Sequence, residues 1–310
     1  MGDTTTIQWA DASWSPVIGC TRRHTGCANC YAEQYGGRFG VRWGPDGTRR
    51  QTSPAYWRKP LSWARKASLD GKRIRVFPSL CDPLDPKIPE GTFLEWMDLI
   101  RRTARVSRHV VPGSMEIRSA GIDWLLLTKR PERWAAVPED VRPLVWLGTS
   151  VSDQATADEW IPRLLGAEGF ALRFLSVEPL VGPVDLDRWV FDRPAAIRSA
   201  MNGSSALNFE QADDVIDPMG ISWIIIGGES GPKARPCDVA WIRAIVGQCR
   251  AAGVPPFVKQ LGARPYMERW NEERQDHETC WLDPEDSQGG DPSEWPEDLR
   301  VREFPEVSRG

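Results

Sequence analysis

The stretch Trp223-Ile-Ile-Ile-Gly-Gly-Glu-Ser-Gly231 decides the fold, because an unbroken apolar run passes directly into glycines and polar residues. An apolar run of strand length is typical of a parallel sheet whose strands are covered by helices. The same pattern occurs in Asp123-Trp-Leu-Leu-Leu-Thr-Lys-Arg-Pro131, where three leucines lead into Thr-Lys-Arg. Repetition of this unit along the chain predicts an α/β protein.

Seven apolar runs are predicted strands, and helical periodicities separate several of them. The strands are expected at Thr5–Trp9, Arg75–Pro78, Trp124–Leu127, Val145–Gly148, Ala171–Leu175, Trp223–Ile226 and Pro256–Lys259. Helices are expected at Phe93–Ala104, Thr156–Leu165 and Val239–Ala252, the last ended by Gly253. The number and regularity of these units favour a (β/α) barrel of the TIM type, complete or incomplete. A flavodoxin-like open sheet is the alternative.

Two ranges interrupt the alternation and are expected to be loop insertions, at about residues 40–69 and 187–219. The barrel domain itself is expected over residues 1–262. The remainder, residues 263–310, is expected to be an acidic, partly irregular extension, since residues 262–310 hold six arginines against fourteen acids.

Three cysteines stand close together in Cys20-Thr-Arg-Arg-His-Thr-Gly-Cys27-Ala-Asn-Cys30, with the spacing C-x6-C-x2-C. Three thiolates on one short segment indicate a metal site, either a 4Fe-4S cluster with one open iron or a zinc site completed by His24. A disulfide is a poor interpretation, because the number is odd. The other cysteines lie on separate predicted elements and are expected outside the ligand set; they are Cys81, Cys237, Cys249 and Cys280.

Every predicted strand after the first ends in polar residues. In a barrel these ends converge on one face, so the cysteine segment after the first strand would lie over a ring of polar side chains. The expected ring consists of Asp82, Lys129, Ser150, Glu178, Glu229 and Lys259.

The segments Ile7–Pro16 and Gly19–Ala32 resemble the opening of a phage-associated family of unknown function with a three-cysteine motif. That family is distantly similar to radical S-adenosylmethionine enzymes. Later blocks that carry the resemblance are Asp123–Pro131, Leu175–Leu180, Gly227–Pro232 and Pro256–Gln260. The x6 gap departs from the C-x3-C-x2-C spacing usual in the radical superfamily. The Gly-Gly-Glu sequence also follows the sixth predicted strand here, whereas in that superfamily it follows the second.

The resemblance implies a radical S-adenosylmethionine-like enzyme of phage or prophage origin, with an electron donor as partner and S-adenosylmethionine as second cofactor. It implies a 4Fe-4S cluster on Cys20, Cys27 and Cys30. The residues expected to contact the second cofactor are Tyr31, Ser79, Asp82 and Ser150, and those expected to act in catalysis are Lys129, Glu178, Glu229 and Lys259. A barrel with a structural Cys3His zinc site, hydrolytic or without activity, and a nucleic-acid-binding module are the alternatives.

Residues 38–75, called the basic segment below, hold eleven Lys or Arg against two Asp. Trp43, Trp57 and Trp63 are interleaved with these cations, a mixture suited to stacking an exposed base of a nucleic acid or nucleotide. A solvated loop is the alternative interpretation. The first residues, Met1–Thr6, lack the basic and apolar regions of a secretory signal, and no apolar run is long enough to cross a bilayer. We therefore expect a cytoplasmic protein without a membrane partner.

Overall fold

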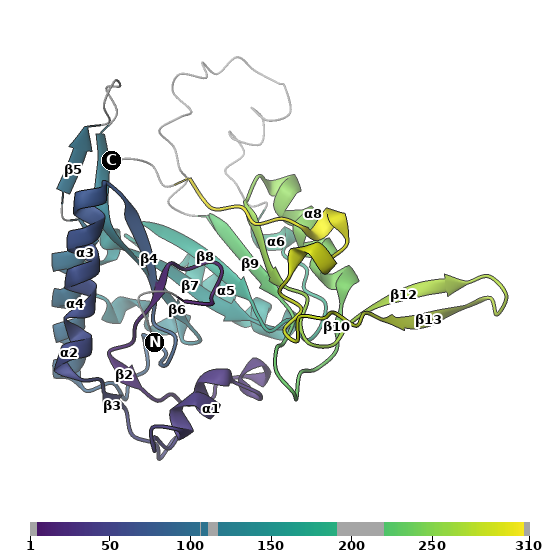
Figure 1. Ribbon diagram of the computed structural model, residues 1–310, viewed down its shortest axis with the longest axis horizontal. Helices are drawn as coiled ribbons and strands as arrows, with labels where there is room; N and C mark the ends of the chain where they lie inside the picture. Colours follow the sequence, from purple (N-terminus) through teal and green to yellow (C-terminus); the bar gives the residue numbers. More distant parts are fainter. Residues whose placement is uncertain (1–4, 106, 111–116, 191–219, 307–310) are drawn as a thin grey trace.

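A computed structural model describes residues 5–105, 107–110, 117–190 and 220–306 of the protein. Seven parallel strands form one curled sheet that is the centre of the molecule (Figure 1). In spatial order they are β1 (Ala12–Ser13), β4 (Arg73–Phe77), β6 (Ile117–Thr128), β7 (Val145–Val151), β8 (Leu172–Val177), β9 (Trp223–Gly227) and β11 (Pro256–Gln260).

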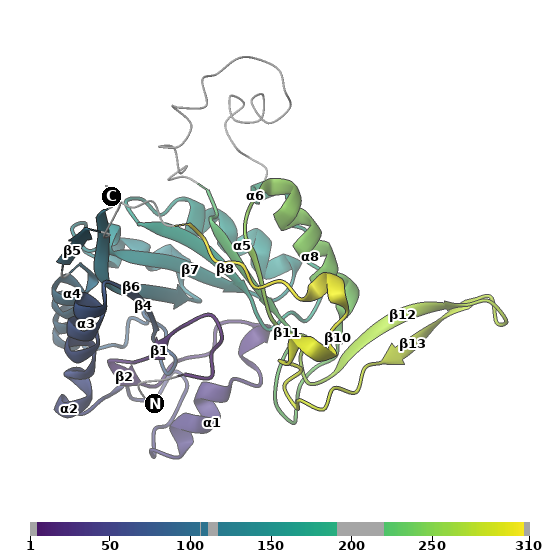
Figure 2. The same ribbon diagram turned by 45° about the horizontal axis from the view of Figure 1, so that its top comes forward.

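The strand order follows the chain order from β1 to β11 without a reversal. A flavodoxin-like sheet contains a switch point at which the order reverses, so that alternative is wrong. The sheet curls into an incomplete barrel (Figure 2), because β1 and β11 do not pair with each other. The prediction of an α/β fold with an incomplete (β/α) barrel is confirmed.

The helices of the βα units lie on the outer face of the sheet. They are α3 (Lys59–Asp70), α4 (Glu90–Ala104), α5 (Gln154–Leu165) and α8 (Val239–Ala252). Their apolar stripes pack against every second residue of the strands, such as Trp124, Leu126 and Leu147, in one continuous core. The predicted helices at Phe93–Ala104, Thr156–Leu165 and Val239–Ala252 are confirmed.

Local sequence signals set the ends of two of these helices. The Asp153 carboxylate accepts the N–H of Thr156 at 2.9 Å, and the Thr156 hydroxyl accepts the N–H of Asp153, which forms a capping box before α5. Gly253 has a φ of 66° and ends α8 in the left-handed conformation that glycine adopts without strain.

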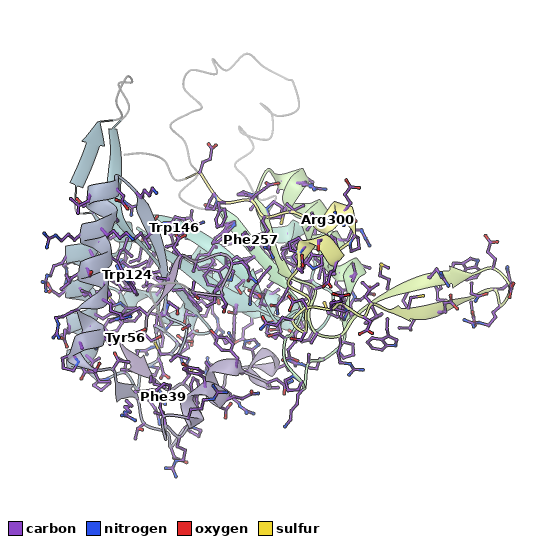
Figure 3. All side chains as sticks on the ribbon, in the orientation of Figure 1. Phe39, Tyr56, Trp124, Trp146, Phe257 and Arg300 are labelled. Carbon is purple, nitrogen blue, oxygen red and sulfur yellow. The ribbon has the colours of Figure 1, made fainter. Side chains whose placement is uncertain are left out.

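The inner face of the sheet carries the other alternate residues of the strands. On this face, the layer farther from the carboxyl ends of the strands is aromatic. Trp146 on β7, Phe174 on β8, Trp223 on β9 and Phe257 on β11 form a second core, in which Trp223 contacts the other three rings. Figure 3 labels Trp146 and Phe257 among the side chains of the curled sheet. These rings therefore fill the part of the half-barrel interior that lies away from the carboxyl ends of the strands.

The two ends of the described chain cover the gap between the first and last strands. Trp9 is 2% exposed and lies between Phe77 of β4, at 4.6 Å between ring centroids, and Trp223, at 6.3 Å. From the other end, Phe304 packs on Trp223, and the Arg75 guanidinium lies 3.8 Å above the Phe304 ring. Aromatic side chains close the incomplete barrel where backbone pairing does not.

Two expectations about the first part of the chain are wrong. The predicted strand Thr5–Trp9 is a turn in which Trp9 packs into the interior of the half-barrel. The first strand of the sheet is β1 at Ala12–Ser13. The range 40–69 is not only a loop insertion, since α3 lies in it and packs on β6 and α4 as the crossover helix. Residues 191–219 of the second expected insertion lie outside the described residues.

The remaining elements are short or peripheral. A hairpin projects from the body of the molecule beside β10 (Cys237–Asp238) (Figure 1). It consists of β12 (Pro265–Asn271) and β13 (Asp276–Trp281), and β10 pairs with β12 in a separate three-stranded sheet. The other segments are β2 (Val17–Ile18), β3 (Arg50–Gln51), β5 (Ser107–Val110), α1 (Tyr31–Gly37), α2 (Pro54–Trp57), α6 (Asp187–Val190) and the 3-10 turns Thr25–Cys27, Pro131–Ala136, Arg142–Leu144, Pro292–Glu294 and Glu297–Leu299.

The acidic extension adds to the core. Trp295, Leu299 and Val301 are buried against the outer-face core, and the N–H of Val258 on β11 donates to the Val301 carbonyl at 2.8 Å. Over the described ranges, no helix combines the length and the apolar character needed to cross a membrane.

We predict that Leu299→Ala lowers the free energy of unfolding by about 2–4 kcal/mol, because it leaves a cavity beside α8. The matched control is Leu69→Ala on α3, where the side chain is 77% exposed and the change should stay within about 0.5 kcal/mol. Urea unfolding of the full chain measures both. Equal, small effects would show that the extension is not part of the folded core.

Candidate active site at the strand ends

A cavity of about 210 Å³ lies at the carboxyl ends of the strands. Its wall includes Cys20, Cys27 and Cys30 together with all eight of the other predicted site residues: Tyr31, Ser79, Asp82, Lys129, Ser150, Glu178, Glu229 and Lys259. Most continue the inner face above the aromatic layer, as Ser150 continues Trp146 on β7 and Lys259 continues Phe257 on β11. The predicted convergence of the strand ends is confirmed.

The cysteine segment is folded into short turns that present the sulfurs toward this cavity. Cys20 follows β2, Cys27 ends the 3-10 turn Thr25–Cys27, and Cys30 directly precedes α1. His24 begins the turn, because its Nδ1 accepts the N–H of Gly26 at 3.1 Å. The His24 ring meets Trp160 of α5 edge-on, at 4.7 Å between centroids. The segment is thus held against α5.

Glu229 fastens the cysteine segment to the end of β9. Its carboxylate accepts Arg235 Nε at 2.8 Å and Nη2 at 2.7 Å, and Asn29 Nδ2 at 3.0 Å. Arg235 Nη1 also donates to the carbonyl of Thr25 at 2.9 Å. Burial opposes ionisation of Glu229, but the hydrogen bonds from Arg235 and Asn29 outweigh it and hold the pKa of Glu229 below its usual range. Glu229 therefore connects the loop to β9 through Asn29 and Arg235, and its expected catalytic role stays a prediction.

Both carboxylate oxygens of Asp82 accept hydrogen bonds from within the protein. Its Oδ1 accepts Thr128 Oγ1 at 2.6 Å and the N–H of Leu84 at 2.9 Å, while Oδ2 accepts the N–H of Lys129 and Arg130 Nη1, each at 2.8 Å. Four donors leave this carboxylate little capacity for a ligand. Asp82 also holds Arg130 in place through this contact, and its expected contact with a cofactor stays a prediction.

The two lysines of the cavity differ in their partners. Lys259 Nζ forms an ion pair with Glu178 Oε1 at 2.9 Å. Lys129 Nζ donates to the neutral Ser150 Oγ at 3.1 Å, and within the described ranges no carboxylate pairs with it. Glu229 with Arg235 and Asp82 with Arg130 are likewise balanced. Lys129 therefore gives the cavity an uncompensated positive charge.

The geometry of the three cysteines bears on the kind of metal they can hold. In the part of the chain that the structure describes, no three His, Cys, Asp or Glu side chains approach closely enough to ligate one metal ion. His24 uses Nδ1 for the turn and packs on Trp160, while its buried Nε2 has no hydrogen-bond partner, so the zinc alternative with His24 as fourth ligand stays a prediction. A 4Fe-4S cluster binds each thiolate through a different iron, so its cysteines surround a space rather than one point. Three cysteines around one cavity fit that requirement.

The cavity also contains Cys81, whereas the other three cysteines do not line it. Cys237 and Cys249 are buried in the outer-face core, and Cys280 lies on β13 of the hairpin. Burial, and then the nearby Asp82 carboxylate, raise the pKa of Cys20 to about 12. Burial also raises the pKa of Cys81 well above its usual value. Both thiols are therefore protonated at neutral pH in the metal-free protein.

The basic segment is only partly available to a ligand. Trp57 and Trp63 are 7% and 8% exposed in the outer-face core, so the expectation that they stack on a base is wrong. Arg49 forms a buried ion pair with Asp85 at 2.6 Å. Phe39 and Tyr31 remain exposed, at 39% and 54%, and Figure 3 shows where Phe39 lies. The exposed cations of the segment are Arg38, Arg42, Arg50, Arg58, Arg65, Lys66 and Lys72.

Sequence reasoning missed Arg49, Asp85, Arg130 and Arg235. Arg130 stood in the quoted Thr-Lys-Arg at the end of β6, which was a usable signal, because a second cation there needs a partner. Asn29 lies between Cys27 and Cys30 and was likewise given no role. Arg235 follows the Gly-Gly-Glu block by six residues, and nothing in the sequence links it to Glu229.

Comparison with known proteins gives a family without a known activity. A family model described as a protein of unknown function, DUF5131, matches residues 4–282, so the chain belongs to that family. No curated protein matches the chain. A solved structure described as spore photoproduct lyase complexed with dinucleoside spore photoproduct is similar to it, with 11% identity and a TM-score of 0.41. The similarity covers 95% of this chain and 75% of the lyase chain.

We predict that His24 makes the metal-free protein less stable in mild acid. Burial, and then the charge of Lys129, lower the pKa of His24 to about 3, so the unfolded chain binds the extra proton first as pH falls below about 6.5. Between pH 7 and pH 5 wild type should lose about 1–2 kcal/mol more stability than His24→Asn, which retains an N-cap acceptor. Urea unfolding at both pH values provides the test. Parallel losses in the two proteins would contradict it.

Proposed function

We propose that this member of the DUF5131 family is an iron–sulfur enzyme of the radical S-adenosylmethionine-like kind that acts on a nucleic acid or nucleotide. The observation that carries the proposal is the cavity itself. Three cysteines of one loop and the polar ends of the parallel strands line a single space closed below by aromatic residues. Such an arrangement combines a metal site with a substrate pocket.

Cys20, Cys27 and Cys30 would hold a 4Fe-4S cluster, which leaves one iron without a protein ligand. When bound, that cluster supplies a single electron for reductive cleavage of S-adenosylmethionine. An electron donor from outside the chain would reduce it. The burial of Cys27 and the partial burial of Cys20 and Cys30 support this assignment, because they limit the access of water to the sulfurs.

The remaining cavity residues suit a cofactor with an adenosine and an amino acid part. Tyr31 would contact the adenine, and its hydroxyl is fixed by donation to the Ser79 carbonyl at 3.1 Å. Ser150 would contact the ribose. Lys129 would bind an anionic group, a carboxylate or a phosphate, because its charge has no carboxylate partner among the described residues.

Glu178 and Lys259 are the proposed catalytic residues. Their ion pair of 2.9 Å lies in the cavity with side-chain exposures of 12% and 21%, and Ser176 Oγ lies 3.5 Å from the other Glu178 oxygen. A carboxylate and an ammonium in contact can hold or transfer a proton at the substrate. Glu229 is proposed to act only through Asn29 and Arg235, which it orients.

The substrate class is proposed from charge. The exposed cations of the basic segment lie on the elements that follow the cysteine segment, and Phe39 and Tyr31 offer exposed aromatic rings beside them. Phosphates would be attracted by the cations, and a base could stack on a ring. The phage association and the cytoplasmic location remain predictions from the sequence.

The metal is tested first. Anaerobically reconstituted wild-type protein should be brown and contain about four irons and four sulfides per chain. Single replacement of Cys20, Cys27 or Cys30 by Ala should remove the colour and most of the iron. Matched controls are Cys237→Ala and Cys249→Ala, which delete buried thiols outside the cavity and should leave iron content unchanged. Colourless wild-type protein with one bound zinc would overturn the proposal.

Nucleic-acid binding is tested with exposed arginines only. Replacing Arg38, Arg42, Arg50 and Arg58 together by Ser should weaken binding of single-stranded DNA or RNA and reduce the salt slope by about one unit for each phosphate that is no longer neutralised. Iron content should not change. Arg49 is left intact because its removal would unpair the buried Asp85. If both proteins had the same affinity and salt slope, the basic segment would be a solvated surface loop and not a nucleic-acid-binding site.

A further inference from the structure

A buried chain of alternating charges lies beneath the first cysteine. Arg49 Nη2 is 2.6 Å from Asp85 Oδ2, Arg130 Nη2 is 3.8 Å from the same oxygen, and Arg130 Nη1 is 2.8 Å from Asp82 Oδ2. The side chains of Arg49 and Asp85 are each 1% exposed, and those of Arg130 and Asp82 are each 5% exposed. Two cations and two anions balance, which a buried network requires.

The network touches the cysteine segment at three atoms. Arg130 Nη1 donates to Cys20 Sγ at 3.9 Å, and Arg130 Nη2 donates to the carbonyl of Thr21 at 3.0 Å. Arg49 Nη2 donates to Thr21 Oγ1 at 2.6 Å. Of the two arginines, Arg130 is the one that contacts sulfur, and Asp82 fixes its guanidinium through Nη1.

We propose that Arg130 is a positioning residue for the metal centre, which holds Cys20 in place and makes the bound cluster easier to reduce. The inference rests on the proposed function, because it assumes a cluster ligated by Cys20. Reduction adds negative charge next to the Cys20 sulfur. A cation and a hydrogen-bond donor at that sulfur stabilise the reduced form, so they raise the reduction potential.

The planar shape of the guanidinium suits Arg130 to this role. Arg130 reaches a sulfur, a carbonyl and a carboxylate with one planar group, and a lysine ammonium on a flexible stem does not match those three directions at once. Removal of Arg130 also leaves Asp82 without its charge partner. Asp82 would then repel the Cys20 thiolate, and less cluster would be retained.

The experiment compares full-length Arg130→Met, the double variant Arg130→Met with Asp82→Asn, and the control Arg73→Met. Arg73 pairs with Asp123 at 2.6 Å at the opposite end of β4 and β6, so its replacement weakens the same sheet without touching the cysteines. Iron and sulfide content are measured after anaerobic reconstitution. Dithionite then supplies one electron per cluster, and the midpoint potential is read by electron paramagnetic resonance.

We expect the reduction equilibrium of Arg130→Met to be at least about tenfold less favourable than that of wild type, about 59 mV for a one-electron couple. Its iron content should also fall, while Arg73→Met matches wild type in both measurements. The double variant removes both charges, so it should regain iron yet keep the lowered potential, because the donor to sulfur is gone. Where Arg130→Met does not fold, the double variant carries the comparison.

The outcomes separate this inference from the proposed function. Wild-type protein with a full cluster, and a double variant with an unchanged potential, would overturn the role of Arg130 and leave the iron–sulfur assignment in place. A potential lowered equally by Arg73→Met would do the same, because the effect would then come from general loosening of the sheet. Wild-type protein that binds no cluster would overturn both.

Discussion

Side chains alternate between the two faces of a strand, and the architecture of this protein depends on that alternation in seven parallel strands held in register. One set of residues meets the helices, and the other set faces the interior. The interior set is aromatic in its lower layer, as at Trp223, and polar in its upper layer, as at Ser150. A one-residue shift of any strand would exchange core for cavity.

The carboxylates that line the cavity are paired with cations. Glu178, Glu229 and Asp82 each have a cationic partner, and the cost of burying these carboxylates is offset by short hydrogen bonds. Lys129 departs from this pattern among the described residues. An unbalanced charge surrounded by balanced pairs is where an anion would gain most from binding, and the pairs hold the surrounding loops in place.

Much of the fold could be predicted because its signals are local. Apolar runs such as Trp223–Ile226 and the capping residues around α5 depend on neighbours in sequence, and the strand ends then follow from the topology. The first strand could not be placed from the sequence, because a tryptophan such as Trp9 is compatible both with a strand and with a turn whose side chain is buried. Its contacts with Phe77 and Trp223, which are distant in the chain, determine which of the two forms. Likewise, the sequence shows an excess of cations but not that Arg49 is buried. Pairings between residues far apart in the chain are absent from any local pattern.

The closure of the barrel by side chains has a consequence for biosynthesis. Trp9 near the beginning of the described chain and Phe304 near residue 306, the last that is described, both pack on Trp223, and Phe304 itself stays 39% exposed. When the cysteine segment and all seven parallel strands have left the ribosome, Phe304 has not yet been synthesised or released. During translation, the face of Trp223 that Phe304 covers therefore stays open to solvent until Phe304 has left the ribosome. The aromatic layer is consequently completed only after nearly the whole described chain has been synthesised.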